Sequence, residues 1–359
     1  MGLLFPKLSR KRQRPSSAAF FLLTATSLTL GAPPSPMTCA SCHRAETASS
    51  VTANMPQALE TAASAAILKS HAQLSTHLGS YSYSVLREGD RSFYTVSNGY
   101  DSLRLELSWA FGQGEAGQTY LFERDGHWYE SRVSFYSALN GLDATLGSHD
   151  KTPENLEEAA GRRMTQSDAR DCFQCHATGA VHNGSLDLAG LTPGVQCARC
   201  HGDVAAHQRA VTTGDAAHAR LPRLNAMSAE EQSDFCGQCH RSWSQIAMNG
   251  PRGVVNVRFQ PYRLTKSKCY DSDERRIRCT SCHNPHENRQ TSSSFYDTKC
   301  LVCHSRSASP ATRASSHLCK VSQANCVSCH MPKTDLPGSH KLFTDHFIRI
   351  AKAGERYPD

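Results

Sequence analysis

The stretch CTSCHNPH at residues 279–286 contains two cysteines three positions apart, and a histidine follows the second directly. This Cys-x-x-Cys-His pattern occurs seven times in the chain of 359 residues and uses all but two of the 16 cysteines. Its cysteines are Cys39, Cys42, Cys172, Cys175, Cys197, Cys200, Cys236, Cys239, Cys279, Cys282, Cys300, Cys303, Cys326 and Cys329. The histidines that follow them are His43, His176, His201, His240, His283, His304 and His330.

This spacing suits the covalent attachment of haem. Two thiols three residues apart form thioethers with the two vinyl groups of one haem, and the adjacent histidine then binds the iron. Paired Cys-x-x-Cys knuckles also bind zinc, but zinc does not require a histidine after every second cysteine, and seven knuckles leave one unpaired. A Cys-x-x-Cys disulfide loop is redox-active rather than a structural framework. The sequence therefore predicts seven covalently attached haem c groups with their iron.

The overall composition fits a protein whose interior is filled by cofactor. Hydrophobic residues make up 39% of the chain and the mean hydropathy is −0.49, whereas histidine occurs 18 times. The formal charge is +7, but five of the basic side chains lie in the first 36 residues. Counting the propionates, seven ferric haems would bring the remainder to about −5. The basic pI is thus no sign of nucleic-acid binding, and we expect redox partner proteins instead.

Residues 1–32 are typical of a signal peptide. A basic stretch that ends at Arg14 precedes the apolar run SAAFFLLTATSLTLGA at residues 17–32. The alternative is an uncleaved anchor, although the run is shorter than the roughly 20 residues that a comfortable span requires. We therefore expect a periplasmic or otherwise exported protein after removal of this leader, with membrane association only if the leader stays uncleaved.

The motifs divide the rest of the chain unevenly. We expect a first haem-binding segment at 37–55, a helix and antiparallel β subdomain at 56–150, and a six-haem domain at 151–359. Helix formers favour a helix over 56–78 that carries His71 and His77. Alternating aromatic and β-branched residues over 80–137 favour four or five strands. The predicted fold is mostly α and irregular, a multihaem cytochrome c fold with an inserted small antiparallel sheet.

Eleven histidines lie outside the motifs, and three have a local reason to be distal iron ligands. His286 lies three residues past His283, and His207 lies six past His201. Because the chain there is pinned to the proximal face of its own haem, each histidine should bind the iron of a neighbour. His340, which follows the CHMP stretch at 329–332 by a short Pro-Gly link, has a similar geometry.

Several of these stretches resemble the cytochrome c-554-type multihaem family, which is related to the haem modules of nitrite reductase and hydroxylamine oxidoreductase. They are residues 109–136, 193–202, 235–243, 258–269, 279–286, 326–333 and 340–350. The resemblance implies distal roles for the histidines of the CHNPH, CHG-x-x-x-x-H and H-x-x-FTDH stretches. These are His286, His207, His340 and His346, and the resemblance favours His71 over His77. Two haems remain without an assigned distal ligand.

Electron transfer is the function that these features favour. Iron with two imidazole ligands has no open position for a substrate, so such a chain moves electrons rather than catalysing a reaction. Whether it is also an enzyme stays open, because one five-coordinate haem could act on a small nitrogen or sulfur compound. A third possibility is a subunit of a cytochrome filament, which would need iron ligands supplied between subunits.

Two cysteines lie outside the motifs, Cys269 and Cys319. Both lie in the six-haem region of a chain that we expect to be exported, where oxidising conditions favour pairing. Two unpaired cysteines held apart by the fold are the alternative, since sequence does not reveal the distance between their Cα atoms. We expect a disulfide between them.

Overall fold

The computed structural model describes residues 38–149, 151–305, 319–352 and 354–359. The predicted signal peptide at 1–32 lies outside these residues. Residues 39–359 cluster as one unit, and the domain boundaries expected within it stay predictions. None of the helices in the described ranges is both long enough and apolar enough to cross a bilayer.

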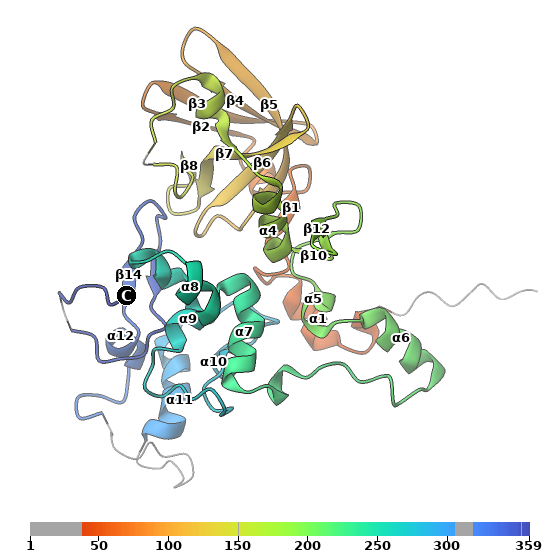
Figure 1. Ribbon diagram of the computed structural model, residues 1–359, viewed down its shortest axis with the longest axis vertical. Helices are drawn as coiled ribbons and strands as arrows, with labels where there is room; N and C mark the ends of the chain where they lie inside the picture. Colours follow the sequence, from red (N-terminus) through yellow and green to blue (C-terminus); the bar gives the residue numbers. More distant parts are fainter. Residues whose placement is uncertain (1–37, 150, 306–318, 353) are drawn as a thin grey trace, which may run out of the picture. The chain divides into compact units, whose positions relative to one another are not determined.

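The largest element is an antiparallel sheet of nine strands (Figure 1). Its strands are β1 (Leu59–Thr61), β2 (Gln73–Leu78), β3 (Tyr81–Glu88), β4 (Arg91–Ser97), β5 (Ser102–Phe111), β6 (Gln118–Arg124), β7 (His127–Tyr136), β8 (Gly141–Ala144) and β9 (Gly161–Arg163). Strands β2 to β8 follow one another in order, while β1 pairs with β5 and β9 with β7. The sheet curls, because its end strands β2 and β8 lie beside each other.

Alternation and turn residues predicted four or five strands over 80–137, and the five strands β3 to β7 lie there. The turn between β6 and β7 shows how the sequence sets the register. Arg124 pairs with His127, so only Asp125 and Gly126 connect the strands, and both have positive φ, 49° and 73°. Such a turn matches the right-handed twist of the strands it joins, and Asp-Gly is a preferred pair there.

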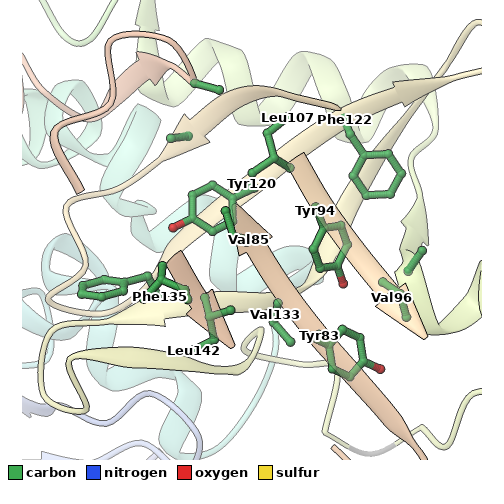
Figure 2. Packing of buried hydrophobic residues seen from close by; sticks show 14 of the residues in the cluster. Tyr83, Val85, Tyr94, Val96, Leu107, Tyr120, Phe122, Val133, Phe135 and Leu142 are labelled. Carbon is green, nitrogen blue, oxygen red and sulfur yellow. The ribbon is translucent and has the colours of Figure 1, made fainter. Parts of the chain in front are cut away.

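The main hydrophobic core lies inside this curled sheet. Figure 2 shows side chains from several strands meeting there, among them Tyr94, Phe122 and Val133. The Phe122 ring stacks on Tyr129 with centroids 5.4 Å apart and lies 5.9 Å from Tyr94. Successive residues of a strand point to opposite faces, and in β3 Tyr81, Tyr83 and Val85 are accordingly buried in alternation. Each large buried side chain contributes about 1.5–3 kcal/mol of transfer free energy.

The predicted helix over 56–78 is wrong. That segment forms β1, the short helix α2 (Ala66–Ser70) and β2. Leu74 of β2 lies opposite Val85 of β3, and both are buried in the core. Helix propensity is a weak preference, and strand pairing with burial of Leu74 outweighs it here.

The expectation of a mostly α and irregular fold is also wrong, because the chain is substantially β. The helices are short: α1 (Arg44–Ser50), α3 (Leu156–Ala160), α4 (Gln166–His176), α5 (Cys197–His201), α6 (Val204–Thr213), α7 (Ala229–His240), α8 (Trp243–Asn249), α9 (Gln260–Leu264), α10 (Cys279–Cys282), α11 (Ser293–His304) and α12 (Cys326–His330). The sheet is larger than expected because residues 59–78 and 141–163 add strands to it. Helix α3 begins at Leu156, where the Asn155 side chain accepts a hydrogen bond from the Glu158 N–H.

Candidate haem-binding sites

Every described motif lies in a helical segment. The motifs at 172–176, 236–240 and 300–304 end α4, α7 and α11, and those at 197–201 and 326–330 form α5 and α12. The other two begin in the 3-10 turn η1 (Cys39–Ser41) and in α10, and their histidines follow these turns. Residues three apart on a helix face the same side, so both thiols of a motif point toward one haem edge. All fourteen motif cysteines are free of disulfides. The local structure therefore fits two thioether bonds to each haem.

The motif on α4 is anchored to the sheet. Phe173, between its two cysteines, is fully buried and meets Trp109 and Phe111 of β5 edge-on, with centroids 5.5 and 5.1 Å away. His176 lies edge-on to Phe111, and its Nδ1 lies 2.9 Å from the Ala58 carbonyl oxygen. These contacts thus fix both the helix and the orientation of the His176 imidazole.

Three motif histidines each face a histidine from a distant segment. The ring centroids are 6.3 Å apart for His43 and His207, 6.1 Å for His201 and His286, and 6.2 Å for His283 and His346. A metal–imidazole bond is about 2 Å long, and a ring centroid lies about 1 Å beyond its nitrogen, so an iron between two imidazoles separates their centroids by about 6 Å. All three pairs have the separation that one iron requires.

Hydrogen bonds at Nδ1 leave the Nε2 atoms of His207 and His346 available. His207 Nδ1 lies 2.6 Å from the Ala219 carbonyl oxygen, and His346 Nδ1 lies 3.0 Å from that of Thr344. An Nδ1–H donated to a carbonyl fixes the tautomer in which Nε2 can bind a metal. Burial lowers the pKa of His346 to about 4 and also lowers the pKa of His201. Both imidazoles are then neutral near pH 7, which is the form that binds iron.

His286 reaches its partner because the CHNPH loop is fastened to residues near the first motif. Asn288 accepts a hydrogen bond from the Asn54 N–H at 2.9 Å and donates one to the Thr52 carbonyl at 3.0 Å. Gly194 brings the third motif to the same place. It has φ +78°, and a Cβ there would lie 1.7 Å from the Pro56 oxygen. Glycine is required at this position by both the conformation and the close approach.

The side chains of His71 and His340 do not pair with a motif histidine in this structure. His71 Nε2 lies 2.9 Å from Asn140 Oδ1. His340 Nε2 lies 2.7 Å from Asp143 Oδ2. Both imidazoles therefore contact residues at or next to β8 of the sheet.

Thiols of different motifs also contact one another. Cys39 lies near Cys197, Cys175 near Cys239, Cys236 near Cys279, and Cys300 near Cys326. The neighbouring Cys175 thiol, together with the guanidinium of Arg199 4.0 Å from the sulfur, lowers the pKa of Cys239. These contacts show which motifs are neighbours.

The expected disulfide between Cys269 and Cys319 is wrong. Both cysteines are free and exposed. The expected export carried no information on the distance between the two Cα atoms, which decides whether a bridge can form.

Comparison with known proteins supports the haem assignment. The family described as "Cytochrome c554 and c-prime" matches residues 130–202, which run from β7 to the third motif. The multiheme cytochrome MtrA of Shewanella baltica (strain OS185) is 24% identical over 207 residues, which cover 52% of this chain and 54% of that protein. The match thus spans about half the length of each. No solved structure matches. The chain is therefore similar to multihaem c-type cytochromes, cytochrome c554 among them, and the motifs together with these similarities support covalently bound haem c and its iron.

Proposed function

We propose that the chain carries seven haems and conducts electrons along them outside the cytoplasm. The observation that carries the proposal is the set of three histidine pairs at the separation one iron requires. Each pair gives a haem two imidazole ligands and so closes the iron to substrates, which suits electron transfer. The seven motifs support the haem count, and the leader at 1–32 supports export. Redox proteins would be its partners.

The pairs assign ligands to three haems. His43 and His207 bind the haem attached at Cys39 and Cys42, since His43 belongs to that motif. His201 and His286 bind the haem at Cys197 and Cys200. His283 and His346 bind the haem at Cys279 and Cys282.

His71 and His340 remain proposed ligands for two further haems. Each would have to exchange its present hydrogen bond, to Asn140 or Asp143, for an iron.

The thiol contacts support an order for the haems. Contacts between Cys39 and Cys197 and between Cys236 and Cys279 link the first motif to the third and the fourth to the fifth. Arg199 of the third motif contacts Cys239 of the fourth, which joins these two pairs. The last two motifs follow through α10, α11 and α12, which pack in sequence. The second motif branches from the fourth through the contact between Cys175 and Cys239.

The first test is the haem count and the iron spin state. Pyridine haemochrome analysis of protein matured in a host with the c-type maturation system should give seven haems per chain. A value of six or fewer would remove at least one motif from the proposal. EPR of the oxidised protein should show low-spin haems at the three assigned sites. A native high-spin haem among the other four would favour the alternative, an oxidoreductase acting at an open iron.

The second test assigns a distal ligand. The variant His286→Ala should convert one haem to high spin, and this should be the haem at Cys197 and Cys200. In a variant that lacks the haem at Cys197 and Cys200, His286→Ala should add no high-spin signal. In a variant that lacks the haem at Cys279 and Cys282, His286→Ala should still add one. His218→Ala is the matched control, because that side chain is 80% exposed and contacts Asp215. An unchanged low-spin spectrum in His286→Ala would refute the assignment.

A further inference from the structure

A fully buried ion pair lies next to His346 in the sequence. Arg263 of α9 and Asp345 have no exposed side-chain surface, and Arg263 donates from Nε to Oδ1 at 2.8 Å and from Nη2 to Oδ2 at 2.9 Å. Two parallel hydrogen bonds of this kind fix the geometry of the carboxylate as well as its charge. The pair is one residue from a proposed iron ligand, yet neither side chain belongs to a haem motif.

The Asp345 carboxylate also binds two residues that follow His346 in the sequence. It accepts a hydrogen bond from the Phe347 N–H at 3.0 Å and another from Arg349 Nη1 at 2.9 Å. Arg263 additionally donates to the Pro358 carbonyl at 2.7 Å. The backbone before and after His346 is therefore fixed to one buried carboxylate.

The same network reaches a second iron-binding histidine. The Arg349 carbonyl oxygen lies 3.0 Å from His330 Nδ1, and the Arg349 N–H donates to the His330 carbonyl at 3.1 Å. Hydrogen bonds to the second nitrogen of a metal-binding imidazole fix its ring orientation and tune its basicity. Arg349 therefore joins the Asp345 carboxylate to the proximal ligand of the haem at Cys326 and Cys329.

Burying these charges is costly unless every hydrogen bond is made, so a buried pair alone is weak evidence for a role in stability. What distinguishes this one is that its hydrogen bonds end on the segments carrying His346 and His330. An exposed pair such as Arg91 and Glu106 on the sheet has no such connection.

We propose that Arg263, Asp345 and Arg349 form a positioning network for two axial ligands at once. The network orients His346 on the haem at Cys279 and Cys282, and it orients His330 on the haem at Cys326 and Cys329. The inference rests on the proposed ligation by His346. It makes Asp345 a residue whose change affects two haems together.

The test uses the matured full chain with Asp345→Asn, which keeps the side-chain shape but removes the charge. EPR should show loss of part of the low-spin signal from the Cys279 haem. A spectropotentiometric titration should show a shifted midpoint potential for the Cys326 haem, with the other haems unchanged. Arg91→Gln is the matched control and should change none of these signals. No change in either haem, or an equal change in all haems, would overturn the inference.

Two further variants separate positioning from stability. Arg263→Lys keeps the charge but cannot make the two parallel hydrogen bonds, so its spectra should lie between those of the native protein and Asp345→Asn. Arg349→Lys keeps the positive charge next to Asp345. If Asp345→Asn does not fold, the spectra of Arg349→Lys test whether the network positions the two axial ligands. Lower stability with native spectra in these variants would mean a structural role only.

His346→Ala distinguishes failure of the inference from failure of the ligand assignment. If it creates no high-spin haem, the proposed ligation by His346 is wrong, and the inference that rests on it falls too. If it creates one while Asp345→Asn leaves both haems unchanged, the ligation stands and only the positioning role is wrong.

Discussion

The sheet region at residues 59–163 and the motif region beyond α6, residues 214–359, differ in what fills their interiors. Inside the sheet, 19 buried residues form one hydrophobic cluster. Beyond α6, the buried cluster in the described residues has only three members, Ile246, Phe259 and Tyr262. Since burial of apolar area is the main favourable term in folding, the two regions cannot be stabilised in the same way.

Hydrogen bonds and the covalent cofactor have to replace that missing core. In the motif region, buried polar groups such as Asp345 hold segments together, and haems are large apolar groups that suit the space between short helices. We therefore expect the sheet region to fold on its own residues and the motif region to need its haems. Three predictions test this separation.

The largest effect should come from withholding haem altogether. Chain produced in a host without the c-type maturation system should keep slow amide exchange in β3 to β7 and exchange quickly in α7 and α11. The reason is that the sheet retains its 19-residue cluster while the motif region loses its principal apolar component. Hydrogen exchange followed by mass spectrometry measures both regions in one sample, with matured protein as the control. Equal loss of protection in the two regions would contradict the separation.

A smaller effect is expected from damaging the sheet core while leaving the haems in place. Phe122→Ala should lower the free energy of unfolding of the sheet region by about 3–5 kcal/mol, because it removes a ring that is 1% exposed and stacked on Tyr129. The haem absorption spectrum should stay native. Denaturant unfolding followed by exchange at β6 amides measures the loss.

Tyr100→Ala is the matched control for this core variant. Its side chain is 97% exposed, so the unfolding free energy should change by no more than about 0.5 kcal/mol. If Phe122→Ala altered the haem spectrum as strongly as it altered stability, the two regions would not be separable.

The same contrast explains how much of the fold the sequence could predict. Strands β3 to β7 were predicted because alternation and Gly-containing turns are local signals, readable without knowledge of the tertiary structure. Strand β2 was missed, because residues 56–78 favour a helix locally and become a strand only by pairing with β3. Strands β8 and β9 are too short to show alternation.

For the haem sites, motif spacing predicted the attachment residues, and local spacing with the resemblance predicted His207, His286 and His346. Which motif each histidine faces depends on contacts between distant segments, such as Asn288 with residues 52–54. The ion pair of Arg263 and Asp345 joins residues 82 apart in the sequence, and no local sequence pattern predicts it. Sequence reasoning therefore predicted candidate attachment residues and iron ligands but not the pairs that these histidines form.

The smallest predicted effect concerns Glu115, whose carboxylate connects the sheet to the motif region. It lies in the loop between β5 and β6, contacts Lys341, and lies 3.3 Å from Arg289. The hydrogen bond from Lys341, followed by weaker effects of Arg289, lowers the pKa of Glu115 below its usual value. The connection should therefore favour folding while the carboxylate is charged.

Glu115→Gln should lower stability at pH 7 by only about 0.2–1 kcal/mol, since the carboxylate is 47% exposed and solvent screens the pair. A carboxylate with a lowered pKa contributes its full stabilisation above its unfolded pKa and loses it as pH falls through the folded pKa. The difference between native and variant unfolding should therefore vanish in acid and shrink in high salt. Glu106→Gln is the control, because its partner Arg91 lies in the same sheet. Only Glu115→Gln should separate the unfolding of the sheet from that of the motif region, and an equal separation by both variants would mean that Glu115 does not couple them.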